Sequence, residues 1–115
     1  MTTLSNETKV SPRFENTRLC YYEGDTFSLE IPIDLSRDGE KIDITENDII
    51  KFTFYDAYGD FFTEREFTNI ENNTVLFDWN EEFTSLFKKG RYTYRIRYNG
   101  ECVRTISADC MVVVE

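Results

Sequence analysis

Three side chains with oxygen atoms stand at alternate positions before a glycine, and this spacing could bind a cation. Asp34, Ser36 and Asp38 precede Gly39 in the order that opens a calcium-binding loop. A complete loop needs a bidentate glutamate at its twelfth position, and this chain has Thr45 there. The spacing therefore favours a plain acidic turn, with weak cation binding as the alternative.

The other carboxylates form no pattern that predicts catalysis. Acid and base hydrolysis of sugars needs two carboxyl groups that face one cleft, and sequence spacing does not place any pair in that way. We expect solvated surface charge at these positions, which are Asp43, Glu46, Asp48, Glu64, Glu66, Glu81 and Glu82.

The chain contains no histidine, so the commonest general base and the commonest metal ligand are both missing. Cys20, Cys102 and Cys110 have no paired spacing, and three cysteines without a histidine make a poor zinc set. We therefore predict no catalytic residue, no metal and no cofactor, and we expect a protein that is not an enzyme.

Polar and apolar residues alternate without a break between Gly90 and Gly100. One face would carry Tyr92, Tyr94, Ile96 and Tyr98, and the other would carry Arg91, Thr93, Arg95 and Arg97. A period of two is typical of a half-buried strand. We expect the tyrosine face in the core and the arginine face at the surface.

The pair Asn99-Gly100 is well suited to a type I′ hairpin turn because both residues tolerate positive φ. A two- or four-residue loop there sets Arg95 opposite Arg104, and like charges in that position need an acidic neighbour. That neighbour can be an acidic patch on another subunit or ligand, or a glutamate on an adjacent strand such as Glu30, Glu64 or Glu66. The resulting interface candidates are Arg91, Arg95, Arg97 and Arg104.

Two aromatic pairs, Tyr21-Tyr22 and Phe61-Phe62, each place a ring on both faces of a strand. One ring of each pair must therefore lie outside the immediate core, which is compatible with a subunit interface or an exposed binding platform. Tyr21 and Phe61 complete the set of interface candidates.

Eight candidate strands alternate with turn signals along the chain. They span residues 17–22, 26–34, 49–56, 61–67, 74–79, 91–98, 101–107 and 110–114. Pro32 is expected on a sheet edge because it has no N–H to donate. We expect a long acidic loop over 35–48 with one helical turn opened by Thr45, and a short helical turn near 81–88.

These elements predict an all-β fold, an immunoglobulin-like antiparallel sandwich of two sheets. A small closed barrel is the alternative. Residues 1–17 contain too few apolar positions to define a core element, so we expect a flexible N-terminal arm followed by one sandwich domain over 18–115.

Length and charge limit the class of partner. A chain of 115 residues has room for one domain. Its net charge of −9 repels phosphate, which weighs against nucleic acid and against an anionic membrane surface. The N-terminus has no apolar signal-peptide core and no run is long enough to cross a bilayer, so synthesis in the cytosol is expected.

Several short motifs follow one another in a recognisable order. They are Gly24-Asp25-Thr26-Phe27 with Leu29, Ile31 and Ile33, then Asp38-Gly39, Ile50-Lys51-Phe52-Thr53-Phe54, Gly90-Arg91-Tyr92-Thr93-Tyr94-Arg95-Ile96, Arg104-Thr105-Ile106 and Val112-Val113-Val114. This order resembles the N-terminal domain of phage baseplate upper proteins, which is an immunoglobulin-like sandwich.

The resemblance implies a non-enzymatic assembly module of a phage or prophage tail baseplate. Such a module would be made in the cytoplasm of a bacterial host, would reside in the virion, and would contact other baseplate proteins as a homo-oligomer. The alternative is a carbohydrate- or calcium-binding sandwich that uses exposed tyrosines and the segment from Asp34 to Glu40.

Overall fold

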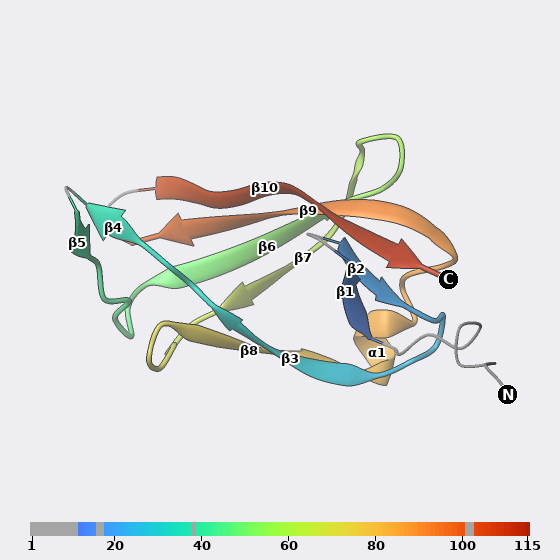
Figure 1. Cartoon of the computed structure of the whole chain (residues 1–115), viewed down its shortest axis with the longest axis horizontal. Coiled ribbons are helices and arrows are strands. Elements are labelled where there is room, and N and C mark those ends of the chain that lie inside the picture. The colour runs from blue at the N-terminus through green and yellow to red at the C-terminus, as the bar shows by residue number, and fades with distance from the viewer. Residues whose placement is uncertain (1–11, 16–17, 38, 101–102) are drawn as a thin grey trace, which may run out of the picture.

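The computed structural model describes residues 12–15, 18–37, 39–100 and 103–115. Strands dominate these residues, together with one short helix, α1 (Figure 1). The elements are β1 (Arg13–Glu15), β2 (Arg18–Tyr21), β3 (Phe27–Pro32), β4 (Ser36–Arg37), β5 (Glu40–Lys41), β6 (Ile49–Tyr55), β7 (Phe61–Phe67), β8 (Thr74–Trp79), α1 (Glu81–Thr84), β9 (Gly90–Asn99) and β10 (Val103–Val114).

The strands form two packed layers. A six-stranded sheet has the order β1-β2-β10-β9-β6-β7, and β3 pairs with β8 in a second, two-stranded sheet (Figure 1). The predicted immunoglobulin-like sandwich is confirmed, although not every pair is antiparallel. Strand β2 runs parallel to β10, with Leu19 beside Val112.

The core lies between the two sheets and consists largely of aromatic rings. Strand β6 contributes one side of the core through Ile50, Phe52 and Phe54, which are all buried. Strand β8 contributes the other side of the core through Val75, Phe77 and Trp79.

The connection from β8 to β9 contains the expected helical turn. The Asn80 side chain caps α1 by accepting a hydrogen bond from the Phe83 N–H at 2.9 Å. The Tyr92 hydroxyl then bonds to both the Lys88 N–H and the Lys88 carbonyl, each at 3.0 Å. A tyrosine that bonds back to this corner is a hallmark of immunoglobulin-like sandwiches.

The segment 35–48 differs from the predicted loop because it contains the hairpin of β4 and β5. The buried Asn73 holds this segment in place. Its amide donates to the Ile42 carbonyl and its side-chain oxygen accepts from the Ile44 N–H, each at 3.0 Å. The expected helical turn at Thr45 is an ordinary turn in which the Asp48 carboxylate accepts from the Thr45 N–H.

Two predictions about edges and ends have different outcomes. Pro32 lies in β3, which pairs only with β8 among the described residues, so its place on an edge strand is confirmed. Residues 13–15 of the predicted arm form β1, which pairs with β2. Apart from residue 12, the rest of the arm lies outside the described residues.

No helix in the described part of the chain is long and apolar enough to cross a membrane.

Candidate functional site

The strand with the clearest sequence pattern carries the candidate surface. Along β9, Tyr92, Ile96 and Tyr98 are buried, whereas Arg91 and Arg97 are exposed. The predicted assignment of the two faces is therefore confirmed. The arginines lie on the side of the large sheet that faces away from β3 and β8.

The neighbouring strands extend this outer face. Strand β6 places Thr53 beside Arg95 and Lys51 beside Arg97. Strand β7 then places Glu64 beside Thr53 and Glu66 beside Lys51. We call this surface of β6, β7 and β9 the basic face; its charged members are Lys51, Glu64, Glu66, Arg91, Arg95 and Arg97.

The register shows why the glutamates do not pair with the arginines. Glu66 lies two strands from Arg97, about 10 Å away by strand spacing, with Lys51 between them. The Lys51 ammonium lies 3.3 Å from the Glu66 carboxylate and forms the ion pair instead. Among the described residues of β6 and β7, no carboxylate therefore forms an ion pair with Arg91, Arg95 or Arg97.

Aromatic side chains and a hollow adjoin Arg95. The hollow, of about 260 Å³, is lined by Tyr55, Gly59, Thr93, Tyr94 and Arg95. The Nε atom of Arg95 is buried and forms no hydrogen bond with the described residues. Arginine beside aromatic rings is the composition that dominates binding energy in protein interfaces.

The hairpin between β6 and β7 adds exposed rings near this hollow. Phe61 is 62% exposed and Tyr58 is 90% exposed. The prediction that Phe61 lies outside the core is confirmed. Phe62 packs inward, with its ring centroid 5.0 Å from those of Phe87 and Tyr92.

The prediction for Tyr21 is wrong. Tyr21 is fully buried, and its ring packs edge-on against Phe27 and Trp79. Tyr22 is the exposed member of the pair, at 39%. The sequence shows that one ring of the pair faces outward, but only the position of β2 in the large sheet decides which one.

The predicted register between β9 and β10 is also wrong. Val103 pairs with Asn99 and Arg104 with Tyr98, so Arg104 does not face Arg95. The strands are joined by three residues, and neither Asn99 nor Gly100 has the positive φ of a type I′ turn. Arg104 therefore lies apart from the basic face, where it donates to the Ser36 carbonyl at 2.9 Å.

The candidate cation ligands are not brought together into a described site. Ser36 pairs with Lys41 in the hairpin of β4 and β5, and Asp38 lies outside the described residues. No group of three or more acidic, cysteine or histidine side chains in the described residues could hold a metal ion. Cys20 is buried and Cys110 half-buried, and Cys102 is outside the described residues.

The opposite outer face of the sandwich, formed by β3 and β8, has the opposite charge. We call it the acidic face; its residues are Ser28, Glu30, Pro32, Thr74, Leu76 and Asp78. It carries two exposed carboxylates and no lysine or arginine. Leu76 is 70% exposed at its centre, beside Glu30. Sequence reasoning missed this face, although the alternation along both strands was available.

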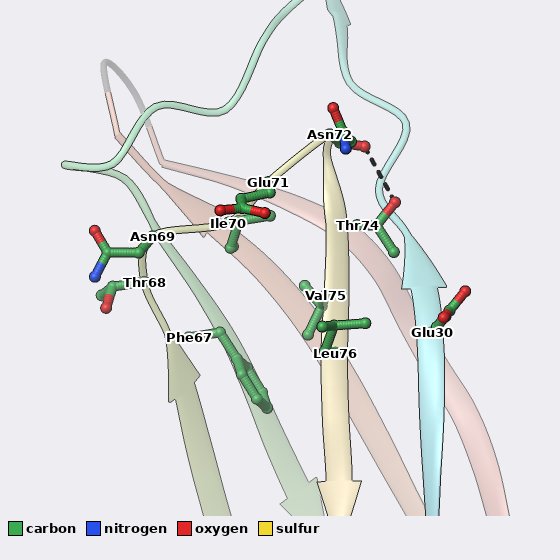
Figure 2. Close-up of a pocket in the computed structure, with 10 residues that line it drawn as sticks. All are labelled: Glu30, Phe67, Thr68, Asn69, Ile70, Glu71, Asn72, Thr74, Val75 and Leu76. Carbon is green, nitrogen blue, oxygen red and sulfur yellow. Dashed lines mark hydrogen bonds between the residues drawn. The ribbon is translucent and has the colours of Figure 1, made fainter.

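A groove of about 550 Å³ lies at the turn between β7 and β8 (Figure 2). Three asparagines in this turn, Asn69, Asn72 and Asn73, have positive φ. Figure 2 shows Thr68 and Asn69 pointing away from Val75 and Leu76, and the Asn72 side chain at the far end of the groove. Because these polar groups diverge, the groove gives less support to a sugar site than the basic face gives to a protein contact.

Comparison with protein-family models, with curated proteins and with solved structures finds no match to this chain. The features that point to a function are therefore the two outer faces of the sandwich. One offers cations and aromatic rings, and the other offers carboxylates around an exposed leucine. Such surfaces can bind a complementary protein surface by charge and by apolar contact.

Proposed function

We propose that this protein is a non-enzymatic assembly module that works through protein–protein contacts on its two outer faces. The observation that carries the proposal is the opposite charge of these faces. The basic face displays Arg91, Arg95 and Arg97 on a chain whose net charge is −9. The acidic face displays Glu30 and Asp78 on the other side of the same sandwich.

Opposite charges on opposite faces favour stacking of copies. If the basic face of one copy meets the acidic face of the next, the contact is head-to-tail and produces a ring or a stack rather than a closed pair. The exposed Leu76 and Phe61 add apolar area to the two sides of such a contact. An acidic surface on a different protein would fit the basic face in the same way.

The order of sequence motifs suggests where this module works. Its resemblance to the N-terminal domain of phage baseplate upper proteins supports a role in a phage or prophage tail, within the virion. In that setting the partners are other baseplate proteins and further copies of the chain. A structural part of a tail needs specific surfaces and no catalytic residues, which agrees with a chain that has no histidine.

Charge reversal on the basic face tests the proposal. We expect the purified protein to self-associate in sedimentation-velocity experiments and to dissociate as salt is raised, because screening weakens exposed charge contacts. Arg95→Glu with Arg97→Glu should weaken association by about tenfold or more. Arg97→Glu alone is a variant with less effect on folding, because the Arg97 side chain is exposed whereas the Nε atom of Arg95 is buried.

Lys88→Glu with Lys89→Glu is the matched control. It changes the net charge by the same amount on an exposed turn outside both faces. Equal weakening by the control would show that net charge alone governs association. A monomer at high micromolar concentration, both alone and with candidate baseplate proteins, would contradict the proposal.

A further inference from the structure

Strand β7 ends the six-stranded sheet and leaves one side of its backbone open. It pairs with β6 through residues 61–67, and no other described strand lies on its far side. An edge of this kind presents unpaired N–H and C=O groups that can pair with an extended segment of another chain. At seven residues, β7 is long enough for such pairing.

Charges alternate along the middle of this edge. Glu64 and Glu66 lie on the outer side and are exposed, whereas Arg65 points toward the inner side beside Phe52. The guanidinium carbon of Arg65 lies 5.1–5.4 Å from the centroids of three rings, those of Phe67, Phe77 and Phe83. Arg65 therefore covers the open side of the aromatic core and is held there by the rings.

The Arg65 guanidinium has no acidic partner among the described residues. A groove of about 390 Å³ adjoins it, with Thr63, Asn80 and Glu82 along its walls. Glu82 lines the groove but forms no ion pair with Arg65. The hydrogen-bond donors of Arg65 are thus available to a carboxylate that enters from the open edge, and a planar guanidinium binds a carboxylate through two parallel bonds.

The same charges disfavour pairing of β7 with a second copy of itself. An antiparallel register centred on Arg65 sets Arg65 against Arg65 and Glu64 against Glu66. Registers centred on Glu64 or on Glu66 set that glutamate against its own copy. Like charges directly opposite each other destabilise a strand pair, so the edge is protected against self-association but open to a complementary strand.

We propose that the β7 edge binds an extended segment of another protein in which an acidic residue lies between two basic residues. The acidic side chain would meet Arg65 on the inner side, and the basic side chains would meet Glu64 and Glu66 on the outer side. This inference rests on the proposed role as a protein-binding module, but it uses the open backbone edge of β7, which lies two strands away from Arg95 and Arg97 on β9. It names the chemistry of one partner.

A short peptide tests this edge directly. We would label the peptide Thr-Val-Lys-Glu-Lys-Val-Thr with a fluorophore and measure its anisotropy with the full chain. Its sequence is palindromic, so it fits β7 in either direction. The charge-swapped peptide Thr-Val-Glu-Lys-Glu-Val-Thr is the control, and it should bind about tenfold more weakly or not at all.

Amide hydrogen exchange locates the bound peptide. We expect added protection in residues 61–67 and little change on β9. Glu64→Lys with Glu66→Lys should abolish binding of the first peptide, whereas Glu40→Lys with Glu46→Lys makes the same charge change at exposed positions in the 35–48 segment and should not. Both variants avoid Arg65, so a folding defect at the aromatic core does not obscure the result.

Three outcomes would overturn the inference: equal binding of the two peptides, protection confined to another element, or no binding at millimolar peptide. None of these outcomes affects the charge-reversal test at Arg95 and Arg97, because that test changes only residues of β9 and measures self-association rather than peptide pairing at the β7 edge. Failure at the edge with success at the basic face would therefore leave the proposed function standing.

Discussion

The two faces of the large sheet come from the same strands but differ in almost every physical property. On the inner face, Phe52, Phe54 and Ile96 are buried among aromatic rings. On the outer face, Arg97 and Glu66 meet solvent, and the described ion pair of that face joins Lys51 to Glu66. Burial of the inner face supplies most of the free energy of folding. The side chains of the outer face can therefore form contacts with a partner.

The largest expected difference between the faces is found at two adjacent residues of β6. Phe54 is fully buried and its ring contacts five others, those of Phe77, Trp79, Phe83, Phe87 and Tyr94. Phe54→Ala should lower the free energy of unfolding by about 3–5 kcal/mol, because it leaves a cavity in the core.

Thr53→Ala is the matched control on the outer face. Thr53 is only 9% exposed, so loss of its methyl and hydroxyl groups should cost about 1–2 kcal/mol, still well below the value for Phe54→Ala. Guanidinium denaturation followed by tryptophan fluorescence measures both values. Similar losses in the two variants would mean that the outer face of β6 is as constrained as its inner face, which would contradict the comparison.

A smaller effect is expected at the corner that leads into β9. Tyr92→Phe removes the hydroxyl that bonds to the Lys88 backbone and should cost about 1–3 kcal/mol, because that backbone loses its partner. Tyr58→Phe is the control, since Tyr58 is 90% exposed. Thermal unfolding of both variants checks this prediction. Unchanged stability of the Tyr92→Phe protein would mean that the hydrogen bonds of the Tyr92 hydroxyl do not stabilise the fold.

Alkaline titration gives a spectroscopic comparison of buried and exposed positions. Burial raises the pKa of Tyr21 and of Tyr94 above the ordinary value of about 10. The neutral phenols therefore stabilise the folded state below pH 10, and this contribution is lost as the pH rises above that value.

Absorbance near 295 nm should show fewer ionised tyrosines in the folded chain than in the urea-unfolded chain above pH 10. Tyr94→Phe should reduce that difference, because it removes a phenol whose pKa is raised by burial. Identical titration curves for folded and unfolded protein would show that neither ring is shielded from solvent.

The smallest effect is expected from the ion pair on the outer face. The Lys51 and Glu66 side chains are 34% and 52% exposed, so solvent screens their attraction. A double-mutant cycle with Lys51→Met and Glu66→Gln should give a coupling of about 0.2–1 kcal/mol that falls as salt rises. A larger coupling that persists in high salt would mean that the outer face contributes to stability as the core does.

Local patterns predicted the strands well but predicted their partners poorly. The alternation in β9 correctly separated the buried Tyr92 from the exposed Arg91. The register of β9 with β10 was wrong because the turn dipeptide Asn99-Gly100 suggested a tighter loop than the one that forms. Gly100 lies so close to the Tyr98 hydroxyl and the Asp48 carboxylate that a Cβ there would collide with both, and this contact involves residues far apart in the sequence.

The candidate site shows the same division. Arg95 and Arg97 could be assigned to one surface from spacing alone, because alternation holds along a single strand. Lys51 and Glu66 could not be added to that surface before the pairing of β6 with β7 and β9 was known. Arg104 was wrongly included because its face depends on pairing across a connection, where a shift of one residue reverses the side.

The sequence by itself determined that this chain is an all-β sandwich with the tyrosine face of residues 91–98 in its core, because periodicity and turn residues act over a few neighbouring positions. Only the tertiary structure decided that Tyr21 is buried, that β2 runs parallel to β10, and that the two outer faces have opposite charge. It also decided that Arg65 turns onto three rings at a free edge. These features depend on which strands meet across the sheets, and long-range packing rather than local pattern selects those partners.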